Sequence, residues 1–234
     1  MSQQINANLS LSSFPNRANV VVTWSGGLDT TALIAYMAME RGAVVFPLFV
    51  NRGQENLARE KGSVRYFSSR FKRKLGSRFK KHFDVSVPIP AHEFKDKFPG
   101  KARQYYALRN SDIVNSGVRY ALLLRIPWVA VGALYDDQMA DISPEYWRIK
   151  NQEVKVATHG KVTVVAPFQG LRWEKSDVVH WCSKNGVDIE KSWTCWKGGS
   201  KQCGDCDACR GRKEAFRKAK VKDPTDYSHW SKVT

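Results

Sequence analysis

The chain lacks any segment that could cross a membrane. Among its 234 residues no apolar run approaches the roughly 20 residues that span a bilayer. The first residues have neither the basic region nor the apolar region of a secretory signal peptide. We therefore expect a cytoplasmic protein without a membrane partner.

Cysteine is scarce and unevenly placed. Four of the five cysteines lie between Cys195 and Cys209, which argues against an extended disulfide framework and suits a reducing compartment. The fifth, Cys182, falls within an expected helix and is better explained as a core residue than as a metal ligand.

Acidic residues are also scarce. Lys and Arg number 38 against 22 Asp and Glu, which gives a formal net charge of +16. Such a surface favours anionic partners, which could be nucleotides, nucleic acid or an acidic protein. Residues 61–83 contain nine basic residues and no acidic one. A run of this kind is usually one solvated helix face, so a nucleic-acid surface stays open without being favoured.

The Gly-Lys-Ser/Thr signature of a Walker loop is absent, which disfavours phosphoryl transfer of that kind. A different phosphate-binding pattern follows the β-branched run at residues 20–23. Two glycines allow the main chain to approach an anion, and the start of a helix offers free N–H groups to it. The nucleotide-binding candidates are Ser25, Gly26, Gly27, Leu28, Asp29, Thr30 and Thr31.

Strand and helix patterns alternate along most of the chain. Apolar runs predict strands at residues 43–50, 84–89, 128–133 and 162–167, and periodic patterns predict helices at 31–39, 55–75, 105–125 and 175–185. This alternation predicts an α/β fold with a doubly wound, Rossmann-like parallel sheet. Open sheets of this class bind ligands at the carboxyl ends of their strands, where the sequence places Gly53 and Gln54. The acidic stretch Asp136, Asp137 and Asp141 also follows a strand, and could hold Mg²⁺ or an amine or be an ordinary solvated loop.

The spacing of Cys195, Cys203, Cys206 and Cys209 is typical of a metal site. Four thiolates so close in sequence suit tetrahedral Zn²⁺. An iron–sulfur cluster is the rival, because overlapping Cys-x2-Cys pairs occur there too. A closed module of four cysteines favours a structural zinc ion that clamps the C-terminal segment.

These motifs resemble one known family. Trp193-Thr194-Cys195-Trp196, Cys203-Gly204-Asp205-Cys206-Asp207-Ala208-Cys209-Arg210-Gly211-Arg212 and Glu214-Ala215-Phe216 are similar to the C-terminal zinc signature of the 7-cyano-7-deazaguanine synthase (QueC) family. That family belongs to the PP-loop ATP pyrophosphatases, whose phosphate loop the Ser25 segment resembles. Gly53-Gln54, Arg109-Asn110 and Ala166-Pro167-Phe168 with Lys175 are similar to the family as well, in the same order.

The resemblance implies a function and a set of roles. Members of the family adenylate 7-carboxy-7-deazaguanine with ATP, add ammonia to form an amide, and dehydrate the amide to the nitrile with a second ATP, in queuosine biosynthesis. Asp29, Arg109 and Lys175 would be catalytic, the Ser25–Thr31 loop with Gly53 and Gln54 would bind ATP and Mg²⁺, and the four clustered cysteines would bind zinc. We expect a lead-in at 1–17, a PP-loop ATP-binding α/β domain at 18–190, a four-cysteine zinc module at 191–220, a tail at 221–234, and a homodimer.

Two loops depart from the family pattern. Arg52-Gly53-Gln54-Glu55-Asn56 stands where the family has Tyr-Gly-Gln-Arg-His, and the segment Asp141-Ile142-Ser143 replaces Tyr-Pro-Asp-Cys-Arg. The ATP half of the pattern is intact, whereas these loops would meet the second substrate. This leaves two alternatives: a ligase that joins the activated acid to another amine, such as that of a protein, or a basic zinc-containing nucleic-acid-binding protein with a vestigial nucleotide site.

Overall fold

A five-stranded parallel sheet forms the centre of the computed structural model, which describes residues 14–87, 106, 108–137 and 139–229. The strand order is β3-β2-β1-β4-β5 and every pairing between neighbours is parallel. The strands are β1 (Asn19–Thr23), β2 (Val44–Asn51), β3 (Phe83–Ser86), β4 (Trp128–Ala130) and β5 (Thr163–Val165). Because β2 lies on one side of β1 and β4 on the other, the chain reverses direction across the sheet at β1, which is where sheets of this class bind ligands.

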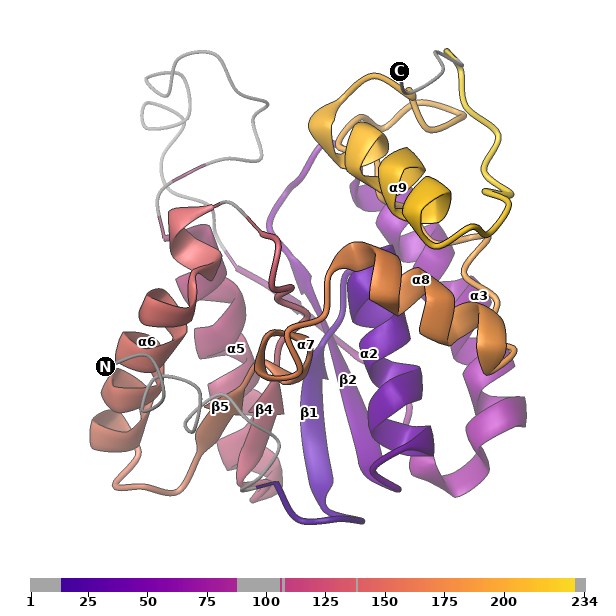
Figure 1. Cartoon of the computed structure of the whole chain (residues 1–234). Helices are drawn as coiled ribbons and strands as arrows, with labels where there is room; N and C mark the ends of the chain where they lie inside the picture. Colours follow the sequence, from indigo (N-terminus) through magenta and orange to yellow (C-terminus); the bar gives the residue numbers. More distant parts are fainter. Residues whose placement is uncertain (1–13, 88–105, 107, 138, 230–234) are drawn as a thin grey trace.

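Helices cover both faces of the sheet, as the sequence predicts (Figure 1). One face carries α2 (Leu28–Met39), α3 (Leu57–Leu75) and α8 (Lys175–Lys184), and the other carries α5 (Arg109–Leu124) and α6 (Pro144–Ala157). The remaining helical segments are η2 (Gly76–Arg78), η3 (Ala140–Ile142), α7 (Pro167–Gly170) and α9 (Asp207–Lys218). In Figure 1, α9 lies above α8, and its Ala215 and Phe216 join the core on that face. Among the described helices, none combines the length and apolar character needed to cross a bilayer.

The predicted helix at 55–75 is confirmed together with its apolar face. Val64, Phe67 and Phe71 are buried against the core, while most of the basic side chains of residues 61–81 are exposed on the other side. Lys61 and Arg70 form ion pairs with Asp84 and Asp188 at 3.0 and 3.1 Å. The run is therefore a largely solvated helix face that is partly neutralised by neighbouring carboxylates.

Some element boundaries differ from those expected. The strands at β4 and β5 are shorter than the apolar runs that predict them, and the helix expected from residue 105 begins at Arg109. The loop predicted around Pro90, Pro99 and Gly100, and the end of the strand expected to reach residue 89, lie outside the described residues. Helix α6 was not predicted, although Ser143 caps it by accepting the backbone N–H of Tyr146 at 3.1 Å, with Pro144 next to it in the first turn. Ser-Pro-Glu is a helix-start signal.

The ends of the chain that the structure describes are packed onto their neighbours. Phe14 is buried edge-to-face against Trp128, with ring centroids 5.2 Å apart, and its carbonyl oxygen accepts a hydrogen bond from Arg41 at 2.9 Å. At the other end, the buried Arg212 donates to Thr225 at 2.8 Å. Residue 14 thus belongs to the core, and the segment that follows α9 folds back onto the cysteine module.

Candidate active site and metal centre

The phosphate loop connects β1 to α2 at the carboxyl edge of the sheet. The Ser25 hydroxyl lies 3.1 Å from that of Thr30 and accepts the Gly27 backbone N–H at 3.2 Å. Leu28 is buried in the core, and Thr31 is fully buried, where its hydroxyl accepts the indole N–H of Trp24 at 3.0 Å. The loop itself is shaped by Ser25, Gly26, Gly27 and Thr30. It is anchored to the core by the buried side chains of Leu28 and Thr31.

Gly26 is required by two features of the loop. Its φ of +74° is a backbone conformation that other residues rarely adopt. A Cβ at this position would also lie 2.9 Å from the carbonyl oxygen of Glu60 in α3. Ser63 of the same helix donates to the Gly26 carbonyl oxygen at 2.6 Å. The first turns of α3 thus hold the phosphate loop from behind.

Lys175 and Asp29 meet beside the loop although they lie 146 positions apart in the sequence. The ammonium of Lys175, in the first turn of α8, donates to Oδ2 of Asp29, in the first turn of α2, at 2.8 Å. Burial alone would lower the pKa of Lys175, but the charges of Asp29 and Asp137 outweigh it and raise this pKa. Lys175 is therefore a stable cation at the mouth of the phosphate loop, and the buried Oδ1 of Asp29 has no hydrogen-bond partner among the described residues.

Asp137 decides between the alternatives left open for the acidic stretch. Its Oδ2 accepts the backbone N–H of Leu134 at 2.8 Å, and burial raises the pKa of Asp137 to about 6. The charges of Lys175 and Asp29 act on this carboxyl, so it lies near that pair and not in a fully solvated loop. Asp136 is exposed, and its carboxylate lies 3.5 Å from the backbone nitrogen of Lys175.

The loop after β2 holds Gly53 and Gln54 in different environments. Gly53 is exposed with a φ of +65°, whereas Gln54 is buried. The Gln54 carboxamide accepts the Arg52 backbone N–H at 2.8 Å and donates to Oε2 of Glu60 at 2.5 Å. In this structure Gln54 therefore fixes the loop to α3.

Arg52 and Arg109 come together at the same edge of the sheet. The positive charge of Arg109, the first residue of α5, lowers the pKa of Arg52, after the larger lowering that burial causes. Asp141 lies next to them, because its Oδ2 accepts the backbone N–H of Asn110 at 3.3 Å. Both loops that depart from the family pattern therefore converge on the start of α5.

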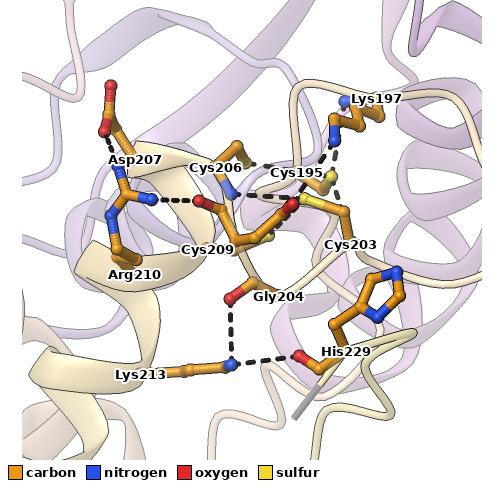
Figure 2. Close-up of polar contacts among 11 residues, drawn as sticks. Cys195, Lys197, Cys203, Gly204, Cys206, Asp207, Cys209, Arg210, Lys213 and His229 are labelled. Carbon is orange, nitrogen blue, oxygen red and sulfur yellow. Dashed lines mark hydrogen bonds and ion pairs between the residues drawn. The ribbon is translucent and has the colours of Figure 1, made fainter. Parts of the chain in front are cut away.

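The four clustered cysteines converge as the spacing predicts, and their sulfur atoms all lie within 4.8 Å of one another. Cys203 and Cys209 are 3.8 Å apart at sulfur, and Cys195 and Cys206 are 4.0 Å apart. Tetrahedral zinc with Zn–S bonds of about 2.3 Å requires sulfur separations of about 3.8 Å, so this cluster fits the ion. Figure 2 shows the four side chains pointing toward one another, with Cys209 on the first turn of α9.

Backbone N–H groups surround these sulfur atoms. Lys197 and Cys203 each donate to the Cys195 sulfur at 3.3 Å, and Cys206 donates to the Cys203 sulfur at 3.3 Å. Such donors favour the thiolate form that a metal ligand must adopt. Gly204 makes the turn with a φ of +85°, and a Cβ there would collide with the carbonyl oxygen of His229. Lys213 donates to the carbonyl oxygens of Gly204 and His229, which closes the module from the C-terminal side (Figure 2).

The cysteine module contacts the phosphate loop directly. The backbone N–H of Trp193 donates to the Gly26 carbonyl oxygen at 3.1 Å. Asn56, in the loop after β2, donates to the Cys195 carbonyl oxygen at 2.9 Å. Sequence reasoning missed Trp193, Asn56 and Glu60 as site residues, since only the folded chain brings them to the loop.

Comparisons with known proteins point to one family. A model of the family described as "Queuosine biosynthesis protein QueC" matches residues 19–220. The chain is 28% identical over 229 residues to the 7-cyano-7-deazaguanine synthase of Thermoplasma acidophilum. This match covers 92% of this chain and 94% of that relative. The chain is 31% identical over 224 residues to the 7-cyano-7-deazaguanine synthase of Pseudoalteromonas atlantica. This match covers 89% of this chain and 98% of that relative.

Among solved structures, the chain resembles the U34-tRNA thiolase NcsA from Methanococcus maripaludis with its [4Fe-4S] cluster. The TM-score is 0.53 at 15% sequence identity, and the match covers 92% of this chain and 69% of that chain. At this level of identity the likeness shows a shared fold.

Proposed function

Because the chain belongs to the QueC family, we propose that it converts 7-carboxy-7-deazaguanine, ATP and ammonia into 7-cyano-7-deazaguanine. The observation that carries this proposal is the Lys175–Asp29 pair, 2.8 Å apart at the mouth of the phosphate loop. This ion pair joins the phosphate-loop segment of the family pattern to the Lys175 segment, which lies 146 positions away in the sequence. Relatives named for this activity match about nine-tenths of the chain.

In the first half of the reaction, the substrate carboxylate attacks the α-phosphorus of ATP and pyrophosphate leaves. The loop residues Ser25, Gly26, Gly27 and Thr30 line the place where the departing phosphates lie, with the α2 N-terminus facing them. Lys175 supplies positive charge as negative charge develops on the leaving group. Arg109 would neutralise the acid or its adenylate from the α5 side.

In the second half, ammonia attacks the carbonyl carbon of the acyl adenylate, AMP leaves, and an amide forms. A second ATP then adenylates the amide oxygen, and loss of AMP and a proton gives the nitrile. A carboxylate or amide resists these steps until its oxygen is part of a good leaving group. The protein contributes mainly by holding the reacting groups together and by excluding water.

Two metal ions complete the proposal. Mg²⁺ would neutralise the phosphates of ATP, and the buried Oδ1 of Asp29, which has no hydrogen-bond partner among the described residues, is an oxygen atom that could bind it. Zn²⁺ would be held by Cys195, Cys203, Cys206 and Cys209 as a structural ion. An iron–sulfur cluster is the alternative occupant, and elemental analysis of the purified protein separates the two.

The other readings of the sequence are less well supported. A protein amine in place of ammonia would keep the adenylation half of the site and rests on the two altered loops alone. A nucleic-acid-binding role rests on the basic face of α3, part of which is neutralised by Asp84 and Asp188. The relatives favour neither, and a cytoplasmic location stays a prediction.

A homodimer also stays a prediction, and the last turn of α5 supports it. Leu122, Leu123 and Leu124 are 40, 74 and 37% exposed. Phe83 is 47% exposed, and its ring is stacked on that of Tyr120 in the same helix at 5.0 Å. Apolar residues grouped in this way often mark a contact between subunits.

The proposal is tested by incubating the purified chain with Mg-ATP, 7-carboxy-7-deazaguanine and ammonia, and by following both ring compounds by mass spectrometry. Consumption of the acid with appearance of the nitrile supports it. Unchanged acid in a sample that still binds ATP would contradict it.

A further inference from the structure

The buried guanidinium of Arg52 is the feature of the site that the family pattern does not explain. Arg52 is only 7% exposed, directly after β2 at the ligand-binding edge of the sheet. Arginine is rarely buried this deeply without a partner that satisfies its charge and its donors. The groups around this side chain therefore indicate its function.

The described neighbours do not fully satisfy Arg52. Its Nε has no hydrogen-bond partner among the described residues. Glu60 contributes most of the attractive charge and Tyr106 interacts with the Arg52 side chain as well. The Oε2 atom of Glu60 already accepts Gln54 at 2.5 Å. Arg109 adds a second positive charge to the same small region. The positive charges of Arg52 and Arg109 therefore repel each other beside a buried side chain. An anionic ligand bound between them would reduce this repulsion.

The position of Arg52 fits a group that reacts with ATP. Glu60 and Ser63, on the α3 turns that follow the Arg52 loop, touch Gly26 of the phosphate loop. The start of α5 with Arg109, and Asp141 beside it, close the other side. An anion held at Arg52 would therefore lie near the phosphates without occupying the loop that binds them.

The resembling family has tyrosine where this chain has Arg52. A phenol offers one neutral hydrogen-bond donor, whereas a guanidinium offers several charged donors in a planar fork that matches a carboxylate. The exchange therefore changes the class of group that the position can recognise.

We propose that Arg52 is a specificity-determining residue that binds the carboxylate of the acid substrate and so distinguishes the acid from its neutral product. This inference rests on the proposed function, because it takes the substrate to be a carboxylic acid on a deazaguanine ring. The nitrile no longer carries the charge of the carboxylate. The contact with Arg52 therefore raises the affinity for the acid substrate and not the affinity for the nitrile product.

The experiment compares wild-type protein with Arg52→Gln, Arg52→Tyr and Arg65→Gln by calorimetric titration. Arg65 is exposed on α3, so its variant removes the same charge without touching the site. The probes are 7-carboxy-7-deazaguanine, 7-cyano-7-deazaguanine and ATP. The two ring compounds differ in the carboxylate alone.

We expect Arg52→Gln and Arg52→Tyr to bind the acid about 10- to 100-fold more weakly, the usual size of a lost hydrogen bond to a charged group. Their affinities for the nitrile and for ATP should stay close to those of wild type, as should all three affinities of Arg65→Gln. Equal weakening of acid and nitrile, or an unchanged affinity for the acid, would overturn the inference. A loss confined to ATP would overturn it too, since the guanidinium would then serve a phosphate.

A second measurement separates this inference from the proposed function. If wild-type protein binds ATP but neither ring compound, the proposed function fails, and thermal unfolding without ligand decides the role of Arg52. A guanidinium kept for a ligand predicts that Arg52→Gln unfolds at a temperature no lower than wild type. Unfolding of Arg52→Gln at a clearly lower temperature would show that Arg52 serves the fold.

Discussion

Trp193 donates its backbone N–H to the carbonyl oxygen of Gly26 at 3.1 Å, which joins the segment before the first clustered cysteine to the phosphate loop. Asn56 makes a parallel connection from the loop after β2 to the Cys195 carbonyl oxygen. One hydrogen bond therefore joins the segment that carries the clustered cysteines to each of the loops that would meet the substrates. Its structural role should extend to the geometry of the ATP site.

The first prediction concerns this coupling. Cys209→Ser should lose the bound zinc and, with it, most of its affinity for ATP, because the module would no longer hold Trp193 against Gly26. Elemental analysis and ATP titration on the same sample measure both effects, and circular dichroism reports whether the sheet stays folded. Cys182→Ala is the control, since Cys182 is fully buried outside the module. A zinc-free Cys209→Ser protein with wild-type affinity for ATP would contradict the coupling.

Sequence patterns predicted the parts of this site that are local in the chain. The four clustered cysteines span residues 195–209, and the phosphate loop is one continuous segment, so a local pattern can identify both. The Trp193–Gly26 and Asn56–Cys195 contacts join residues far apart in the sequence. They depend on how α3 and the cysteine module pack together, which no local pattern encodes.

The same limit explains the less accurate predictions. Three consecutive leucines at 122–124 point in different directions around a helix, so composition alone could not say which face they occupy. Val118 and Ala121 take the buried side instead. The sequence also could not decide whether Asp137 lies in a solvated loop, because its burial depends on how the folded chain brings it near Lys175 and Asp29.

The second prediction concerns Lys175. Lys175→Met should lower ATP-to-AMP turnover by about 100- to 1,000-fold, the usual effect of removing one preorganised electrostatic contact from a reacting group. Loss of the cation would also leave Asp29 without its partner, so the ATP concentration needed for half-maximal rate should rise. Lys184→Met, at the exposed end of α8, is the matched control. Equal AMP formation by Lys175→Met and wild type would remove Lys175 from the mechanism.

The third prediction is a pH dependence of stability. Burial raises the pKa of Asp137 from 3.8 to about 6, so between these values the folded protein holds a proton that the unfolded chain has released. The stability that this group contributes is therefore present below about pH 4 and is lost as the pH rises through about 6. Asp137→Asn should raise the free energy of unfolding at pH 8 by about 1–3 kcal/mol and leave it nearly unchanged at pH 4. Urea unfolding at both pH values measures this, and an equal effect at each would assign the gain to packing.

The fourth prediction concerns the oligomeric state. Leu123→Glu places a charge at the most exposed of the three leucines at the end of α5. If this surface joins two copies, burial of the unpaired charge should shift the protein to a monomer. Light scattering measures the mass directly, with Val156→Glu, at an exposed site on α6, as the control. A Leu123→Glu protein of unchanged dimeric mass would place the contact elsewhere, and a monomeric wild-type chain would contradict the predicted dimer.

In the proposed reaction, one site activates the same substrate carbon twice, first in the acid and then in the amide. The most direct measurement is the ratio of AMP released to nitrile formed, with Mg-ATP and 7-carboxy-7-deazaguanine present and ammonia either supplied or left out. We expect two AMP for each nitrile when ammonia is supplied, and no nitrile without it. Release of AMP without any nitrile, although ammonia is present, would contradict the proposed reaction. So would the release of one AMP for each acid molecule, with the acid joined to another amine.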